Sequence, residues 1–583
     1  MFRLKPLKLS IILTLTLFAC SQSKKAPNLQ APLFDQLGDN HFAITTSNEW
    51  SQKFFDQGLT LTYGLNHDEA MRSFKEGARL DEECAMCYWG MAYVLGPNIN
   101  AAMDSSLVVE ANGYIAQAKQ YLDKVTPLEQ QMIAAIALRY PKNEKQTLSS
   151  CYESFAESMR TTYLNFKENN DMATLCAEAL MDLHPWDYWN AETGEPQPWT
   201  EEILNILENT LAANPKHPGA NHYYIHATEA SRNPGRAIEA ANTLIDLVPA
   251  AGHLVHMPAH IYIRTGDYHE GSIAGELSVV ADSLYITNCK AQGVYPLSYY
   301  PHNYHFLAAT ATLEGRGNLA IQSAFKVAQN ADAQLMYQPE WATLQHYYII
   351  PYYILVKFGQ WDKVLELPKP DLLYPEAIWH YARGMAFLGT NQVELAQNEL
   401  VSLQKINGNE ELQQISIWEL NTVDHLVRIA TLILEAELEN NQGNTEIAIS
   451  KLIEAVAVED QLNYNEPPDW FFSVRHILGA IYLENDAYEL AEKTYLEDLA
   501  VYPKNGWALK GLQMSLEAQD RTNEAQKVSE ALSEAWQHAD FELSSSRILN
   551  TSIPVFNDLD VKTLSARLTN IPELPICGVK KKS

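Results

Sequence analysis

The sequence predicts an all-α fold made of repeated pairs of helices, and two observations lead to this prediction. Apolar residues recur about every 3.6 residues, the spacing of a helix face, and no stretch shows the alternation typical of strands. Similar segments also recur about every 34 residues. The chain has 583 residues, 46% of them hydrophobic and 20% charged, so it can bury a large core. One long array of stacked helical hairpins accounts for both periods.

The clearest repeat unit lies near the C-terminus. This unit resembles the tetratricopeptide pattern at Leu478, Gly479, Tyr482, Ala491, Tyr495 and Pro503. It departs from the pattern at Arg475, where the pattern has Trp. Partial matches in the same register are Gly58, Ala70 and Phe74; Ala237, Ala241 and Pro249; Ala259, Tyr262 and Gly271; Ala308, Ala320 and Ala324; and Gly384 and Ala396. The resemblance implies a right-handed α-solenoid of roughly 8–12 helical hairpins over about residues 45–540.

The N-terminus is predicted to be a targeting segment. Residues 1–19 carry basic residues followed by a short apolar run, and Leu17-Phe18-Ala19-Cys20 resembles a bacterial lipobox. The resemblance implies cleavage before Cys20, acylation of that residue and a tether over residues 20–41. It places the protein in the cell envelope, anchored to a bacterial membrane, and we expect the outer membrane with the protein facing the periplasm. The alternative is an ordinary secretory signal with an incidental cysteine.

The remaining chain divides by composition. We expect helical repeats over 42–180, a Trp- and Pro-rich loop over 181–200, histidine-rich repeats over 201–370, further repeats over 371–540, and a loosely attached extension over 541–583. Residues 288–300 are expected to be an insertion between two units.

Charge and cysteines restrict the function classes. The formal net charge of −30 excludes a nucleic-acid partner, because a polyanion would be repelled.

Besides Cys20 there are six cysteines, an even number that is compatible with disulfides. The sequence leaves their pairing open: Cys84, Cys87, Cys151, Cys176, Cys289 and Cys577. Tyr88 follows Cys84-Ala-Met-Cys87, so this motif is not a c-type haem site. The two cysteines could pair, pack in a helix or act in redox chemistry.

The most informative feature is a set of histidines that repeat in register. With units beginning at Pro218, Gly252 and Pro301, position 5 holds His222, His256 and His305; position 9 holds His226 and His260; and position 2 holds His253, His302 and, one unit later, His346. Glu229 is at position 12. These positions share one helix face. In tetratricopeptide proteins that face lines the concave groove, so the resemblance implies that the side chains meet in one cavity.

This pattern predicts a transition-metal site of copper, iron or zinc. The i,i+4 pairs His222/His226 and His256/His260 can each bring two imidazoles to one ion, and Glu229 could add a carboxylate. Candidate ligands are His222, His226, His253, His256, His260, His302, His305 and Glu229. The alternatives are a polar ligand-binding groove and a structural network with neighbouring tyrosines. Whether the protein is an enzyme stays open; if it is, metal-assisted oxidation or hydrolysis is favoured, because no nucleophile motif is present.

A loop beside these units is a candidate lid. Trp186, Trp189 and Trp199 would form its apolar wall, with Asp187 nearby; alternatively, the rings cap neighbouring hairpins. A second Pro-rich turn, residues 466–472, joins the site only if the superhelix curls back.

The chain as a whole resembles a group of bacterial tetratricopeptide lipoproteins of unassigned activity. The stretches that carry this resemblance are HPGANHYYIHATE (217–229), AGHLVHMPAHIYIRTGDY (251–268) and EPPDWFF (466–472). Two further functions therefore stay open beside metal binding. One is a scaffold that binds a peptide or protein partner in the groove, and the other is a lipoprotein that captures glycans through its 12 Trp and 30 Tyr.

Overall fold

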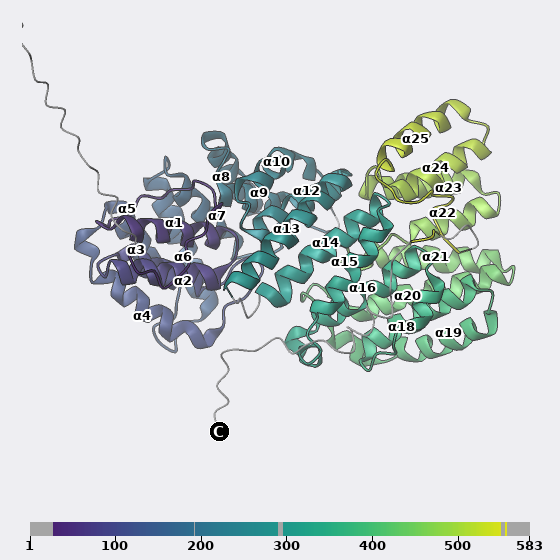
Figure 1. The fold of residues 1–583 in the computed structure, drawn as a ribbon, viewed down its shortest axis with the longest axis horizontal. Coiled ribbons are helices and arrows are strands. Elements are labelled where there is room, and N and C mark those ends of the chain that lie inside the picture. Colours follow the sequence, from purple (N-terminus) through teal and green to yellow (C-terminus); the bar gives the residue numbers. More distant parts are fainter. Residues whose placement is uncertain (1–26, 192, 290–294, 550–553, 557–583) are drawn as a thin grey trace, which may run out of the picture.

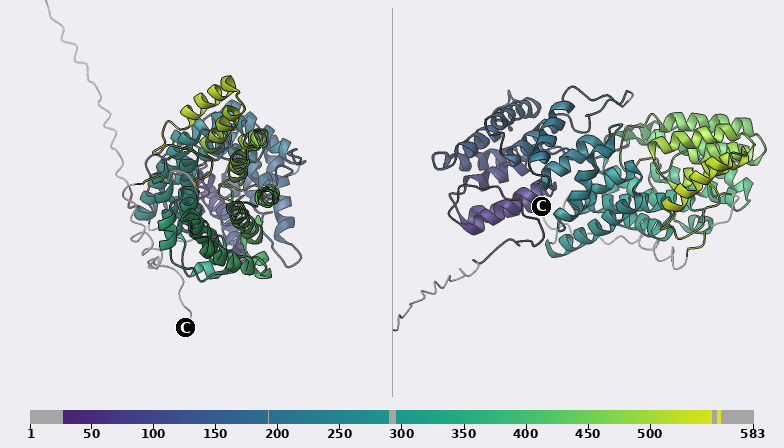
Figure 2. Two further views of the ribbon diagram at one scale, coloured as in Figure 1. Left: turned by 90° about the vertical axis from the view of Figure 1, so that its right-hand side faces the viewer. Right: turned by 90° about the horizontal axis from the view of Figure 1, so that it is seen from above.

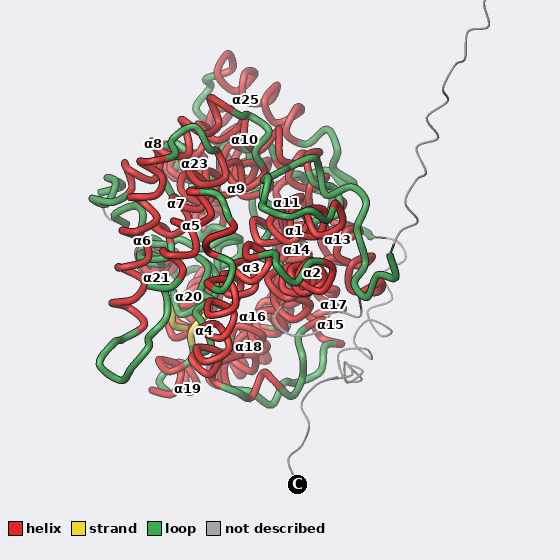
Figure 3. The backbone as a smooth tube through the Cα atoms, turned by 90° about the vertical axis from the view of Figure 1, so that its left-hand side faces the viewer, coloured by secondary structure: helices red, strands yellow, loops and turns green. Residues whose placement is uncertain are grey.

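The computed structural model describes residues 27–191, 193–289, 295–549 and 554–556, and the regular structure of these residues is helical (Figure 1). The exception is one antiparallel pair of two-residue strands, β1 (Ser416–Ile417) and β2 (Asn421–Thr422), drawn in yellow in Figure 3. The predicted signal peptide, Cys20 and most of the C-terminal extension lie outside the described residues. No helix in the described ranges combines the length and apolar character needed to cross a membrane.

Successive helices pair as hairpins. In the N-terminal half these are α1 (Glu49–Tyr63) with α2 (His67–Leu80), α3 (Ala85–Val94) with α4 (Val108–Lys119), α5 (Pro127–Ile136) with α6 (Leu148–Asn165), α7 (Asn170–Met181) with α8 (Thr200–Ala213), α9 (Pro218–Glu229) with α10 (Ile238–Leu247), and α11 (Gly252–His256) plus α12 (Pro258–Thr265) with α13 (Tyr268–Cys289). The C-terminal half pairs α14 (Tyr300–Leu313) with α15 (Gly317–Asn330), α16 (Thr343–Lys357) with α17 (Trp361–Glu366), α18 (Leu373–Gly389) with α19 (Val393–Asn407), α20 (Val423–Asn441) with α21 (Thr445–Glu459), α22 (Arg475–Glu484) with α23 (Tyr488–Val501), and α24 (Gly506–Ala518) with α25 (Thr522–Ala535). Short helical turns lie between them at Ser105–Leu107, Leu122–Lys124, Pro234–Ala237, Tyr295–Tyr299, Leu335–Tyr337, Pro339–Trp341 and Glu410–Gln414. The described residues therefore form an α-solenoid of twelve hairpins, within the predicted range.

Glycine–aromatic contacts explain the repeat pattern. The ring of Phe74 on α2 lies between Gly58 on α1 and Gly90 on α3, and a Cβ atom at either glycine would come within 2.6 Å of it. The ring of Tyr495 on α23 lies in the same way between Gly479 and Gly511, where a Cβ atom would come within 2.4 and 2.0 Å. Such distances are far inside van der Waals contact, so only glycine lets these helices approach so closely.

The superhelix curls back on itself at both ends, although the molecule is elongated overall (Figures 1 and 2). At the N-terminal end, α1 contacts α9, and the ring Nδ1 of His222 lies 2.6 Å from the backbone oxygen of Tyr63. At the C-terminal end, the hydroxyl of Tyr268 donates to the carbonyl of Pro503 at 2.8 Å, and the indole N–H of Trp507 donates to Thr312 at 2.9 Å. The inward faces of the array are therefore packed against other parts of the chain.

The apolar core consists of two clusters that meet at α12. One runs from Leu37 to Tyr262 and the other from Ala259 to Phe556. The predicted histidine stripe lies at this junction, so a polar cluster occupies the seam between two apolar cores.

The C-terminal extension differs from the prediction in the part that the structure describes. Phe541 packs against Phe358 and Trp507, and buried Arg547 forms ion pairs with Glu437 and Glu484. A buried guanidinium is tolerated only when it is paired, and these contacts fix the segment on the repeats. The expectation of a loose attachment is therefore wrong for residues 541–549.

The cysteine pairing that the sequence left open is partly answered. Cys84 and Cys87 form a disulfide at the start of α3, whereas Cys151 and Cys176 are buried thiols. Cys577 lies outside the described residues, as does the side chain of Cys289.

Candidate metal centre

Helix α9 supplies the first two histidines of the site and is buried along its whole length. It begins at Pro218, which suits the first helical position, and His217 caps it by accepting from the amide of Ala220 at 3.1 Å. His222 and His226 lie one turn apart, and their ring centroids are separated by 4.8 Å.

The next unit begins with a helix that is interrupted. Helix α11 carries His253 and His256, and α12 carries His260. Helix α12 begins at Pro258, whose nitrogen has no proton to donate to the preceding turn, so the helix is interrupted between His256 and His260. His256 and His260 nevertheless keep the i,i+4 arrangement, with ring centroids 4.7 Å apart.

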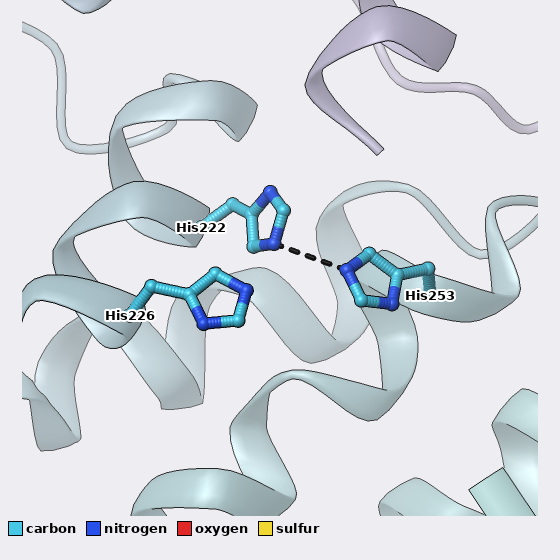
Figure 4. A group of neighbouring side chains, drawn as sticks. All are labelled: His222, His226 and His253. Carbon is cyan, nitrogen blue, oxygen red and sulfur yellow. Dashed lines mark hydrogen bonds between the residues drawn. The ribbon is translucent and has the colours of Figure 1, made fainter. Parts of the chain in front are cut away.

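Three imidazoles from α9 and α11 form a first triad, His222, His226 and His253 (Figure 4). The Nε2 atoms of His222 and His253 lie 3.2 Å apart, and the three potential ligand atoms lie within 4.8 Å of one another. Ring centroids are 4.9 Å apart for His222 and His253 and 6.3 Å apart for His226 and His253.

A second triad, His256, His260 and His302, repeats this geometry one unit later. The Nε2 atoms of His256 and His260 lie 2.9 Å apart. The ring of His302, a partly exposed residue of α14, lies 4.9 Å from His256 and 5.8 Å from His260. Each triad thus takes positions 5 and 9 of one unit and position 2 of the next, so the repeat itself builds the same site twice.

Glu229 joins the two triads. One carboxylate oxygen accepts from Nδ1 of His226 at 2.7 Å, the other accepts from Nδ1 of His260, and the hydroxyl of Tyr464 donates to the second oxygen at 3.3 Å. The side chain of Glu229 is fully buried. With both oxygens taken by imidazole N–H groups, this geometry favours Glu229 as the residue that orients the two histidines over its predicted use as a direct ligand.

These hydrogen bonds fix where the protons lie. A carbonyl and a carboxylate can only accept, so His222, His226 and His260 carry their protons on Nδ1. Each Nε2 atom then presents a lone pair to its triad. Within the described residues, Nε2 of His226 and Nδ1 of His253 and His256 are buried without a hydrogen-bond partner.

A third copy of the pattern is incomplete. His305 at position 5 and His346 at position 2 of the following unit lie close together, with ring centroids 5.6 Å apart. Position 9 holds Ala309, so the third imidazole is missing. His305 stacks on Phe471 and joins neither triad, unlike the other six predicted histidines.

The Trp-rich loop lies between α7 and α8 and only part of it reaches the site. The ring of Trp186 contacts that of His226 edge to face at 5.2 Å, and the indole of Trp189 donates to Ala227 on α9 at 2.8 Å. Trp199 stacks on His184, and Asp187 accepts from Gln197, so these two residues stabilise the loop itself. Trp186 is thus the one residue of the predicted wall that lies against a triad ring.

The segment around residue 466 does reach the site, because the superhelix curls back. Ligand atoms of Glu466, Glu229 and His260 lie within 4.8 Å of one another, and Arg264 contacts both glutamates. Nε of Arg264 is 3.8 Å from Glu466, and its guanidinium donates to the backbone oxygen of Glu229 at 2.9 Å. The sequence predicts that residues 466–472 join the site only if the superhelix curls back, so the structure fulfils that condition for Glu466. Arg264 and Tyr464 are not among the predicted site residues, and Tyr464 is 235 positions from Glu229.

Burial favours the neutral form of His222, His253, His256 and His302. It lowers the pKa values of His222, His253 and His256 well below the usual range, with each neighbouring histidine adding to the effect. Burial likewise lowers the pKa of His302 to about 3. Burial alone would raise the pKa of Glu229, but His260 and His226 hold it below its usual value, so the carboxylate is ionised.

The arrangement fits metal ions. With metal–nitrogen bonds of about 2 Å, two nitrogens on one ion are roughly 3.3–3.5 Å apart for tetrahedral or trigonal angles. The closest nitrogen pairs, at 3.2 and 2.9 Å, are near this spacing. Imidazoles whose second nitrogen is held by a hydrogen bond, as in His222, His226 and His260, are the donor arrangement typical of protein metal sites.

Comparison with known proteins gives no family assignment: no family model matches the chain, and no curated protein does. Solved structures with similar folds include human IFIT1 as a dimer with m7Gppp-AAAA (14% identity, covering 84% of this chain and 91% of that chain, TM-score 0.28). Others are the APC/C hetero-tetramer Cut9-Hcn1 (12%, 89% and 76%, TM-score 0.27) and yeast Tom70 (10%, 85% and 93%, TM-score 0.25). Similarity this low carries no argument about function.

The structure itself defines the class of protein. The chain is a helical-repeat α-solenoid with tetratricopeptide-type hairpins, and a cluster of buried histidines lies where its two cores meet.

Proposed function

We propose that this protein binds transition-metal ions at two trihistidine sites joined by Glu229. The observation that carries the proposal is the repetition: the same three repeat positions build both triads, with matching ring separations. A set of histidines kept only for packing would have no reason to recur at the same positions with the same geometry.

The unpartnered nitrogens favour metal binding over a structural network. Leaving a buried polar atom without a partner costs about 1–3 kcal/mol. A network of hydrogen bonds would satisfy Nε2 of His226, yet that atom has no partner within the described part of the chain. Because the pKa values of these imidazoles are lowered, protons would not compete strongly for them at neutral pH.

Metal content tests the proposal directly. Protein prepared without a His tag and loaded with copper, zinc or iron salts should hold two equivalents of metal per chain, measured by inductively coupled plasma mass spectrometry. His226→Ala and His260→Ala should each remove one equivalent. The control His41→Ala should remove none, because His41 is exposed and is not part of either triad. No stoichiometric metal after reconstitution would refute the proposal.

A scaffold role is the second candidate, and one surface favours it. Helix α13 exposes Ile273, Leu277, Val280 and Leu284, an apolar stripe at helical spacing. The helical-repeat architecture also fits a protein that binds a peptide or protein partner. In this case partner binding would survive the change of His256 and His260 to Ala. Glycan capture has less support, because Trp89, Trp361, Trp470 and Trp507 are buried.

We also propose that acylated Cys20 anchors the protein to a bacterial membrane. The support is the lipobox-like sequence alone. Cys20→Ala should move the protein from the membrane fraction to the soluble fraction and abolish incorporation of labelled palmitate.

A further inference from the structure

The donor set of the two triads is unusual in having no charge. All six residues are histidines, which bind metal ions as neutral imidazoles, and no described thiolate or carboxylate is among the three residues of either triad. Manganese, magnesium and calcium prefer carboxylate and water oxygens, and non-haem iron commonly takes two histidines with one carboxylate. Imidazole-only sites suit copper and zinc.

The charge around the triads separates these two metals. Glu229 is the carboxylate that touches both triads, and it contributes one negative charge. Two divalent ions would bring four positive charges into this buried cluster, whereas two monovalent ions would bring two, and Glu229 offsets one of them in either case.

The surroundings make excess charge costly. Phe306 lies against all three rings of the second triad, at centroid distances of 4.7 Å from His256, 4.3 Å from His260 and 5.1 Å from His302. Tyr299 contacts His253 at 4.9 Å in the first triad. Aromatic walls lower the local dielectric constant, and the free-energy cost of net charge rises accordingly. A hydrophobic surrounding therefore favours the metal ion of lower charge.

We propose that the two triads bind a pair of copper(I) ions, one in each triad. This inference rests on the proposed metal-binding function and specifies its cofactor. Copper(I) is monovalent, binds imidazole nitrogen and is stable with three ligands, so a triad satisfies it without a water molecule. Zinc bound to three histidines generally keeps a water as its fourth ligand.

The test is a competition on the wild-type, metal-free protein. We would titrate it under argon with copper(I) buffered by bicinchoninate, and separately with zinc(II), and then expose the zinc-loaded protein to buffered copper(I). Metal content and the X-ray absorption edge of copper are measured. We expect two copper(I) ions per chain, a shell of three nitrogen atoms around each, no electron paramagnetic resonance signal and complete displacement of zinc.

The outcomes distinguish this inference from the proposed function. If two zinc ions bind and equimolar buffered copper(I) fails to displace them, the copper(I) inference is overturned and metal binding stands. If neither metal binds, both are overturned. His302→Ala should lower the copper content from two equivalents to one, and the matched His41→Ala should leave it at two. Because the decisive comparison uses the wild-type chain, a variant that misfolds does not affect it.

Discussion

Replacing Glu229 by Gln should weaken one triad far more than the other. The carboxylate now accepts from Nδ1 of both His226 and His260. An amide keeps one acceptor oxygen but offers N–H groups on its other side. The imidazole facing those N–H groups must turn its Nδ1 into an acceptor, and its proton then moves to Nε2, which can no longer bind a metal.

The expected loss of metal affinity follows from the role of Glu229 in orienting His226 and His260. Loss of a residue that orients a metal ligand typically lowers metal affinity about 10- to 100-fold, which is about 1.4–2.8 kcal/mol. Competition with a chromophoric copper(I) chelator should therefore resolve one site near the wild-type affinity and one site weakened within this range. A matched control is Glu178→Gln, because Glu178 is also fully buried and accepts from a tyrosine hydroxyl, but it lies outside the triads.

Equal affinity at both sites, within about threefold of the wild type, would refute the reasoning. In that case Glu229 would not set the proton positions of the two histidines. A similar loss in the Glu178→Gln control would show instead that the effect comes from general destabilisation.

Three further predictions concern parts of the chain outside the two triads. Burial lowers the pKa of Lys357 from 10.5 to about 7. Between about pH 7 and pH 10.5, Lys357 is therefore protonated in the unfolded chain and mostly deprotonated in the folded chain. The wild-type free energy of unfolding should therefore rise relative to Lys357→Met by about 1.4 kcal/mol per pH unit from pH 7 to 9, measured by urea denaturation; a constant difference would contradict this. Gly90→Ala should destabilise the fold by about 1–3 kcal/mol in thermal unfolding, because the added Cβ atom would lie 2.6 Å from the Phe74 ring. The control Gly113→Ala should stabilise the protein by about 0.5–1 kcal/mol, because no atom lies within 4 Å of the Cβ atom added in α4. Ala309→His should complete the third copy of the pattern and raise the metal content from two equivalents to three; a content that stays at two in folded protein would refute the repeat logic.

The histidine register was accessible from sequence because it depends on local periodicity. Helices α9 and α11 begin at Pro218 and Gly252, the unit starts that the repeat pattern predicts, and α14 begins one residue before Pro301. Once these starts are fixed, helical geometry places positions 2, 5 and 9 on one face. The structure brings together six of the predicted histidines, three in each triad, from adjacent first helices.

Long-range features of the site could not be predicted in the same way. The approach of Tyr464 and Glu466 to Glu229 depends on superhelical curvature, which accumulates from small rotations at each hairpin. The histidines that the repeat resemblance places in a groove are almost all buried, because parts of the chain distant in sequence pack against the helices that carry them. The sharing of Glu229 by two histidines depends on side-chain rotamers that periodicity does not encode.

The most direct test of two trihistidine sites is anomalous X-ray diffraction from crystals of the metal-loaded protein, recorded on both sides of the metal absorption edge. We predict two anomalous peaks, one within about 2–2.2 Å of nitrogens of His222, His226 and His253, and the other equally close to His256, His260 and His302. Peaks only at surface residues, or no peak among these six imidazoles, would contradict the account.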